Sequence, residues 1–459
     1  MPTTSSIVTP IAGLKFQFKQ TANGGSLFLK NAVTAYSVTG SSGAFNRITS
    51  ANYPTTTSPG AVYLNQSMFV QELATAAIYQ SSTGTILDWG ALDFITPEME
   101  PSCAVAIAKS LNYLAALKEW DTQFFFFDPD ATKPGSSLRN VESAYLKLGC
   151  ATADSIVEFD GGIVFMSKRD QTQRSREIHV LNGLTPKKIS TAEVERILNG
   201  DDLATCYALY LSTAGHQFYV LTLVTSAITI VYDFNNGMWY QWSKLTAQAP
   251  KSVTALTASG QTATATVTAH GYGDGEPVLI AAADQAAYNG TFNISVVDAN
   301  TFTYLMASEP ASPATGTITA TGYTESYFPA VSYATFNNLD LVLGESDGII
   351  YSIDPDVYDD NGVPIRFGIR TPPWDGGNLD RKQFVRSRVI SDIESGTIMQ
   401  RHTDDDYNTN SPYQPIPLGD YDTDILTTGQ TRRRAWEYLY TSTTPLRVET
   451  AEHELTPGK

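Results

Sequence analysis

Cysteine and histidine are both scarce in this sequence. Its 459 residues include 3 cysteines, at positions 103, 150 and 206, and 5 histidines. The cysteines are widely spaced and form no C-x-x-C pair, which argues against a disulfide framework and a zinc site. No histidine lies in an H-E-x-x-H motif, and there is no G-x-x-x-x-G-K-S/T phosphate loop. We therefore expect no catalytic residues, no metal ligands and no cofactor, in a protein that is not an enzyme.

Long apolar runs and basic charge are also lacking. No stretch approaches the roughly 18 apolar residues that cross a membrane, so we expect no membrane insertion by this chain. Lys and Arg total 30 against 47 Asp and Glu, a net charge of -17. This charge repels nucleic acid at long range, which argues against a sequence-reading DNA binder but leaves a DNA conduit open. The first residues show no signal-peptide pattern, and we expect synthesis in a reducing cytosol.

Aromatic residues are abundant, and many fall in short β-type runs separated by turns. The clearest case is HQFYVLTLVTSAITIVYDFNNGMWYQW at 216–242, where Asp233–Gly237 supplies a turn. This meander of about 27 residues is close in size to one propeller blade. Weaker copies occur at 26–47, 60–94, 111–127, 161–184 and 339–353. The repetition predicts an all-β fold, a β-propeller.

Residues 252–323 interrupt this series and contain no Lys or Arg. Ala and Thr dominate there, and Asn-Gly and Asp-Gly pairs supply turns between short β-type runs. The segment predicts a small inserted all-β module, immunoglobulin-like or similar. We expect the following division: a first part of the propeller at 1–249, the module at 250–323, a return to the propeller at 324–365, and a β-rich C-terminal assembly or platform region at 366–459.

The C-terminal region concentrates arginine and alternates it with acidic runs. The candidate assembly or DNA-channel contacts are Arg432, Arg433, Arg434, Trp436, Asp404, Asp405, Asp406, Asp420 and Asp424. The arginine triplet either contacts DNA phosphate in a channel or forms salt bridges with a neighbouring subunit or an adaptor, which the negative net charge favours. The acidic runs either line a channel, so that passing DNA does not stick, or are solvated loops.

Two acidic turns are the best candidates for a metal site. They are Asp128-Pro129-Asp130 and Asp354-Pro355-Asp356, the second followed by Asp359-Asp360-Asn361-Gly362. Carboxylates of this kind suit Ca²⁺, but the spacing lacks the bidentate Glu that closes an EF-hand loop. Asp and Asn also favour turns without any metal, so we interpret both segments as ordinary turns.

An ordered set of segments between 91 and 242 resembles a known family. The segments are ALDFITPEMEPSCAVAIAKSLNYLAAL (91–117), TQFFFFDPD (122–130), RNVESAYLKLGCATADSIVEFDGGIVFMSK (139–168), VLNGLTPKKISTAEVERIL (180–198), HQFYVLTL (216–223) and VYDFNNGMWYQW (231–242). They resemble the packaged-DNA stabilisation proteins of short-tailed phages, also called tail hub or tail nozzle proteins. Residues 354–372 and 429–440 also look familial, whereas 252–323 resembles a small β module that recurs in phage virion proteins.

The resemblance implies a structural virion protein of the tail, synthesised in the host cytoplasm. It implies a homo-oligomer, a hexameric tube below the portal and adaptor rings, which retains packaged DNA and serves as the conduit for its ejection. The partners that it implies are the head-to-tail adaptor ring, tail fibres or tailspikes, a tail needle or plug, and packaged double-stranded DNA in non-specific contact.

Two other functions stay open on the sequence alone. A receptor- or glycan-binding β-propeller protein of the tail would use the inserted module as its sugar-contacting part and would present exposed aromatic side chains. A propeller hydrolase would need carboxylates that converge on the propeller axis.

Overall fold

The computed structural model describes residues 17–20, 26–39, 44–128, 130, 135–160, 162–168, 175–345, 348–378, 380–394, 396–419 and 424–457. The chain divides into two compact units. One consists of Met1–Gln241, Ala330–Phe336 and Asp340–Tyr351, and the other of Trp242–Pro329, Asn337–Leu339 and Ser352–Lys459. The four-part division expected from the sequence stays a prediction. The compact units assign residues 352–365 to the second unit, because the strand that begins at Val363 pairs with a C-terminal strand.

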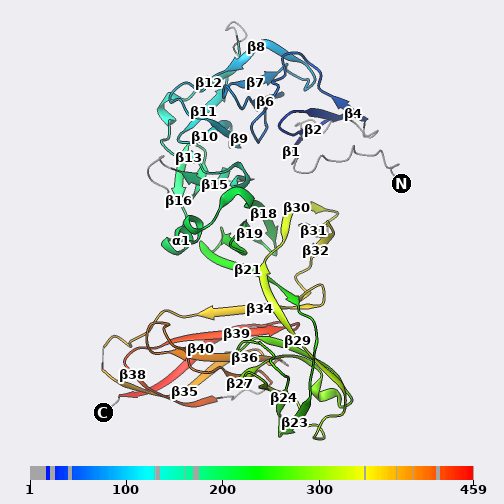
Figure 1. The fold of residues 1–459 in the computed structure, drawn as a ribbon. Coiled ribbons are helices and arrows are strands. Elements are labelled where there is room, and N and C mark those ends of the chain that lie inside the picture. Colours follow the sequence, from blue (N-terminus) through cyan, green and yellow to red (C-terminus); the bar gives the residue numbers. More distant parts are fainter. Residues whose placement is uncertain are drawn as a thin grey trace. The chain divides into compact units, whose positions relative to one another are not determined.

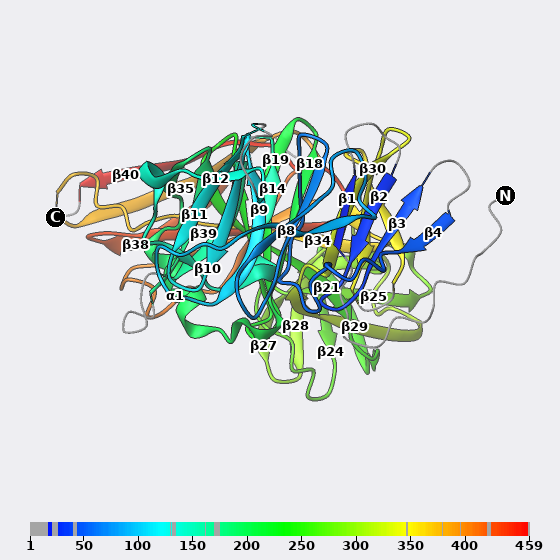
Figure 2. The same ribbon diagram turned by 90° about the horizontal axis from the view of Figure 1, so that it is seen from above.

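The strands of the first unit form successive antiparallel sheets, each built from neighbours in the sequence. The first sheet is β1 (Gln17–Gln20), β2 (Ser26–Lys30), β3 (Ala35–Thr39) and β4 (Ala44–Arg47). The second is β5 (Val62–Leu64), β6 (Ser67–Gln71), β7 (Ile78–Ser81) and β8 (Trp89–Ile95). The third is β9 (Ala104–Ser110), β10 (Tyr113–Lys118), β11 (Thr122–Phe127) and β12 (Leu138–Asn140), whose strands lie side by side in Figure 2.

The next sheets continue the same pattern. One contains β13 (Gly149–Cys150), β14 (Val157–Phe159), β15 (Gly162–Lys168), β16 (Arg176–Asn182) and β17 (Thr185–Lys188), and is followed by the helix α1 (Ala192–Gly200). Another series is β18 (Tyr207–Thr213), β19 (His216–Leu223), β20 (Ile228–Asp233) and β21 (Met238–Ala247), and residues 243–247 of β21 pair further with residues 323–327 of β29 (Gly316–Tyr327). The last contains β30 (Ala330–Phe336), β31 (Leu339–Gly344) and β32 (Ile350–Ile353).

These sheets follow one another around an arc, from blue β1–β4 through green β18–β21 to yellow β30–β32 (Figure 1). Strands near the start of successive sheets contact each other: β5 contacts β1 and β9, and β14 contacts β9 and β18. β18 in turn contacts β30. Successive sheets that each meet the next along one strand are the blades of a β-propeller, which confirms the fold class predicted from the sequence.

The core of the first unit lies between neighbouring blades. Along β15, Ile163 and Phe165 pack in a cluster with residues of the third sheet, such as Phe124. The alternate residues Val164 and Met166 pack in a second cluster, with residues of β19 and β20. Because successive side chains of a strand point to opposite faces, this division shows that both faces of the blade are covered. Burial of each such side chain contributes about 1.5–3 kcal/mol.

In the second unit, the Ala- and Thr-rich segment forms two sheets around a core of its own. One sheet contains β22 (Lys251–Ser252), β25 (Pro277–Ala283), β26 (Gly290–Asn293) and β29 (Gly316–Tyr327), and the other β23 (Ala255–Ser259), β24 (Thr262–Thr266), β27 (Ser295–Asp298) and β28 (Thr301–Leu305). Small residues face large ones, since Ala263 pairs with Tyr304 and Ala265 with Phe302. All four side chains are buried, so the alternation lets the aromatic rings fill the space between the sheets.

The C-terminal strands form two further sheets. One has the order β33 (Asp359–Asp360), β34 (Val363–Arg370), β39 (Ala435–Ser442), β36 (Thr397–Thr403), β37 (Gln414–Pro417). The other has the order β38 (Asp424–Thr431), β35 (Lys382–Ser391), β40 (Val448–Pro457). Phe384, Ile398, Ile416 and Trp436 belong to the core between them.

A network of charged side chains lies on β39 and its neighbours. Glu437 accepts hydrogen bonds from Arg370 at 2.5 Å, from Arg401 at 2.8 Å and from the Tyr413 hydroxyl at 2.9 Å. Burial alone would raise the pKa of Glu437, but the bonds from the two arginines and Tyr413 hold that pKa below its usual value. The backbone N–H of Tyr413 also donates to Asp274 at 3.1 Å, which ties the module to these sheets.

Candidate functional site

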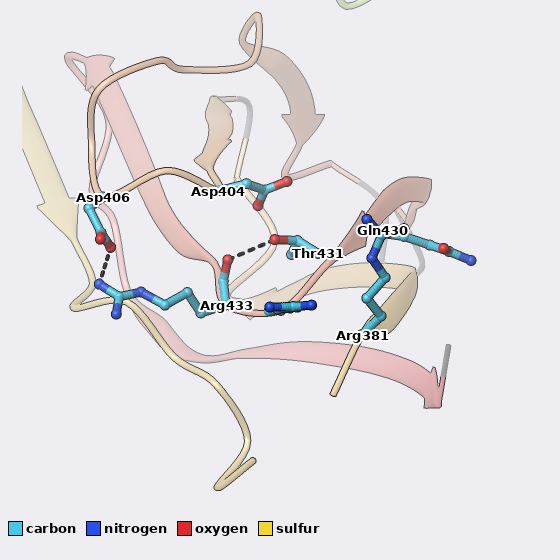
Figure 3. A pocket seen from close by; sticks show the side chains of 7 residues that line it. Arg381, Asp404, Asp406, Gln430, Thr431 and Arg433 are labelled. Atoms are coloured by element: carbon cyan, nitrogen blue, oxygen red, sulfur yellow. Dashed lines mark hydrogen bonds and ion pairs between the residues drawn. The ribbon is translucent and has the colours of Figure 1, made fainter. Parts of the chain in front are cut away.

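Residues from three segments, including three arginines, surround a pocket in the second unit. The pocket has a volume of about 380 Å³. Its lining residues are Arg381, Asp404, Asp406, Gln430, Thr431, Arg432 and Arg433, and we call it the arginine pocket (Figure 3). Arg381 precedes β35, the two Asp residues follow β36, and the rest come from the end of β38 and the turn into β39. The pairing of Lys382 with Thr431 brings the first and last of these segments together.

Arg434 follows the pocket residue Arg433 in the sequence and is 1% exposed. Its guanidinium makes a bidentate pair with Asp404, Nε to Oδ1 at 2.7 Å and Nη2 to Oδ2 at 2.8 Å. The same guanidinium stacks over the ring of Phe384, 4.5 Å from its centroid. Such geometry fixes both charges, so Arg434 serves the interior of this chain and is not accessible to a DNA phosphate.

Trp436 is likewise part of the interior. Its side chain is buried, and its ring stacks on His453 with centroids 3.9 Å apart. Burial, followed by the charge of Arg434, lowers the pKa of His453 to about 4. The sequence-predicted Trp436 is therefore brought close to the arginine triplet, but as a core residue.

The turn after β36 accounts for the other two acidic residues of its run. Asp405 closes the turn, because its carboxylate accepts bonds from the Thr409 hydroxyl and N–H and from the Thr403 hydroxyl, which lower its pKa to about 2. Asp406, with a φ of +58°, points to Arg433 and forms an ion pair with it (Figure 3). Both partners of this pair are exposed, so it contributes little stability.

Arg381 and Arg432 differ from their neighbours. Both side chains are exposed, and neither forms an ion pair with any residue that the structure describes. The pocket therefore presents two uncompensated guanidinium groups beside two carboxylates that are already paired. Guanidinium groups in this state recognise carboxylate or phosphate oxygens.

The last two predicted acidic residues lie elsewhere or outside the structure. Asp424, on β38, makes a bidentate ion pair with Arg388 at 2.7 and 3.1 Å. It also forms a single, longer ion pair with Arg386 at 3.5 Å. The bonds from Arg388 lower the pKa of Asp424. Asp420 lies outside the described residues. Because Asp404, Asp406 and Asp424 are compensated within the chain, they offer less charge to a channel wall than the sequence indicates; that they line one stays a prediction.

The sequence-predicted turns behave as turns where they are described. Asp354 Oδ1 accepts the N–H of Asp356 at 3.0 Å, and Asp128 Oδ1 accepts the N–H of Asp130 at 3.2 Å. Among the described residues, no group of three or more His, Cys, Asp or Glu side chains is arranged to hold a metal ion. No described helix is both long and apolar enough to span a bilayer.

A family model described as bacteriophage P22 Gp10, beta-propeller, matches residues 12–265, more than half of the chain. The chain belongs to this family. The match confirms the family resemblance, and with it the β-propeller fold, for a structural phage protein of the packaged-DNA stabilisation family of short-tailed phages. A protein of this family is a virion component, and the family is one of structural proteins rather than enzymes.

Other comparisons are weaker. No curated protein matches the chain at a significant level. The solved structure of dihydro-heme d1 dehydrogenase NirN in complex with DHE is 8% identical with a TM-score of 0.36, and the alignment covers 74% of this chain and 65%, less than two thirds, of that protein. YCF48 from Cyanidioschyzon merolae is 10% identical with a TM-score of 0.30, covering 64% of this chain and 82% of that one. At these scores the likeness says nothing about function.

Proposed function

We propose that this protein is a subunit of the tail tube of a short-tailed phage, the nozzle or hub below the portal and adaptor rings. In this role it retains the packaged genome and serves as the conduit through which the genome is ejected. The observation that carries the proposal is membership of the packaged-DNA stabilisation family over residues 12–265.

The physical character of the chain supports this role. Buried apolar clusters join the first five sheets to one another, so this part of the propeller suits a rigid wall. The net charge of -17 suits a conduit, because a wall rich in cations would bind each phosphate and hold the duplex back. The partners that follow from the role are further copies of this chain in a hexameric ring, the adaptor ring, tail fibres or tailspikes, a tail needle or plug, and packaged double-stranded DNA in non-specific contact.

The module does not favour the glycan-binding alternative. Its large aromatic side chains Tyr272, Tyr288, Phe302 and Tyr304 are buried in its own core. Sugar-binding sites stack their ligands on exposed rings, and within 252–323 the exposed large apolar side chain is Val297. We therefore propose a structural role for the module as well.

A nonsense mutation in the gene for this chain tests the proposal. In a non-suppressing host we expect filled heads that lose their DNA on purification and lack the distal tail in negative-stain images. Wild-type chain supplied from a plasmid should restore both DNA retention and the tail. Particles that keep their DNA and a complete tail without this chain would contradict the proposed function.

A further inference from the structure

The arginine pocket presents two exposed guanidinium groups that can bind an anion from outside the chain. Arg381 and Arg432 are exposed and have no ion-pair partner among the described residues, while the pocket residue Asp404 is held by the buried Arg434. Because Asp404 is already held by Arg434, a ligand does not have to order that part of the pocket. A carboxylate is a ligand that exposed guanidinium groups bind well.

A matching acidic segment lies elsewhere in the second unit. Residues 354–358, which we call the acidic loop, carry exposed Asp354 and Asp356 followed by Val357 and Tyr358, which are 51% and 40% exposed. Neither carboxylate forms an ion pair with a described residue, and the bond from the Asp356 N–H to Asp354 holds the turn. Exposed tyrosines are enriched among the residues that anchor protein interfaces.

Strand register places the acidic loop and the arginine pocket at opposite ends of the β34–β39 pair. The acidic loop leads into β33, which pairs with Val363 and Pro364 at the start of β34. At the other end of β34, Arg370 pairs with Glu437, and beyond it Trp374 bridges to Arg434. β34 has 8 residues, which at about 3.3 Å each makes a separation of roughly 25 Å. The loop of one copy therefore does not fill the pocket of the same copy.

The strand between the two ends is itself suited to a protein partner. Ile365, Phe367 and Ile369 alternate along β34 and are 41%, 42% and 50% exposed. They form an apolar stripe on one face, with the acidic loop at its start and the arginine pocket beyond its end. Complementary patches at separate places on one molecule make head-to-tail contacts, which close into a ring when the rotation between copies allows it.

We propose that the arginine pocket of one copy binds the acidic loop of a second copy, with Asp354 and Asp356 reaching Arg381 and Arg432. The inference rests on the proposed function, since a tube requires copies to join head to tail. DNA is the less suitable occupant, because a duplex needs a track of cations rather than two.

Charge reversal tests the contact in assembling particles. Full-length chains carrying Arg432→Glu or Asp356→Arg are supplied from a plasmid to the nonsense mutant, and copies per particle are measured by quantitative immunoblot. We expect each single reversal to reduce incorporation at least tenfold, and the double reversal Arg432→Glu/Asp356→Arg to restore it to within threefold of wild type. The control Arg196→Glu reverses an exposed arginine of α1, 79% exposed, and should incorporate normally.

The outcomes separate this inference from the proposed function. If wild-type chain is not found in complemented particles, the tube proposal fails. If wild-type chain is incorporated and the single reversals are incorporated equally well, or if the double reversal restores nothing, the contact between pocket and loop is wrong while the tube stands. Normal incorporation with leakage of DNA in Arg432→Glu particles would assign the pocket to phosphate and overturn the inference. Arg432→Gln and Asp356→Asn, which remove charge without reversing it, should give smaller losses and guard against misfolding.

Discussion

The inserted module and the C-terminal sheets are both small β structures within one unit, yet they are held together differently. The module core consists of alanines, aliphatic side chains and aromatic rings, such as Ala265 and Phe302. The C-terminal sheets bury charge among their apolar residues: Arg434 is 1% exposed and lies between Asp404 and the ring of Phe384. The stability of the module therefore depends on the packed volume of its core, whereas that of the C-terminal sheets depends also on the pairing of buried charges.

This difference matters because the two kinds of core fail in different ways. An apolar core loses stability in proportion to the volume removed from it. A buried ion pair contributes little net stability when intact but costs much when one partner is removed, since the other charge stays in a poorly solvated place. The buried pair instead fixes a geometry, and here it fixes the position of Asp404, which lines the arginine pocket.

The largest effect is expected from Phe302→Ala in the module. Phe302 is 0% exposed and faces Ala265 across β24 and β28. Removing the ring should lower the free energy of opening of the module by about 3–5 kcal/mol. Hydrogen exchange followed by mass spectrometry, peptide by peptide, measures this in the full chain.

The same experiment tests whether the two regions open independently. Peptides from β38 to β40 should keep their protection in Phe302→Ala, and the matched control Val297→Ala, at a side chain 63% exposed, should change neither region. Equal loss of protection in both regions would show that the module and the C-terminal sheets open together. The two cores would then not differ in how they contribute to stability.

A smaller effect is expected from Asp404→Asn. The substitution leaves the Arg434 guanidinium buried without its carboxylate, and because Asp404 is itself 36% exposed we expect a loss of about 2–3 kcal/mol in the C-terminal sheets. Asp392→Asn is the control, since Asp392 pairs with Arg447 at 3.8 Å with both side chains exposed, and should cost less than about 0.5 kcal/mol. Similar losses in the two variants would mean that burial of Arg434 does not matter.

The propeller could be predicted because its blades are local in sequence. In the segment 216–242, β-type runs and the Asn-Asn-Gly turn predict β19, β20 and β21, and the structure has them with Gly237 at a φ of +67°. Each blade forms from strands that are consecutive in the chain. By contrast, β35 pairs with β38 and with β40, which begins 66 residues after the start of β35 at Lys382. Alternation of polar and apolar residues specifies a strand but not which distant strand pairs with it.

The site was predictable only in part for the same reason. Three consecutive arginines and an acidic run were visible, and the structure brings Arg433 to Asp406 and Arg434 to Asp404. Which arginine is buried was not visible, because that depends on where β39 begins, at Ala435. Arg381 was missed as a site residue, since only the pairing of Lys382 with Thr431 places it in the pocket.

The smallest effect concerns pH. Burial, then the charge of Arg434, lowers the pKa of His453 from 6.5 to about 4, so between these values the unfolded chain binds a proton that the folded chain does not. Stability of the C-terminal sheets is therefore complete above pH 6.5 and falls as the pH is lowered toward 4, by about 1–2 kcal/mol for a partly buried group. His402, whose pKa is lowered by burial and then by Arg434, adds to the same trend. Hydrogen exchange of β39 and β40 peptides at pH 7 and pH 4.5, corrected for the intrinsic exchange rates, should show this loss of stability in the wild type and a smaller loss in His453→Gln. An equal dependence of stability on pH in the variant would mean that His453 is solvated enough to be protonated in the folded state. It would also mean that Asp404 neutralises the effect of the Arg434 charge on the His453 ring.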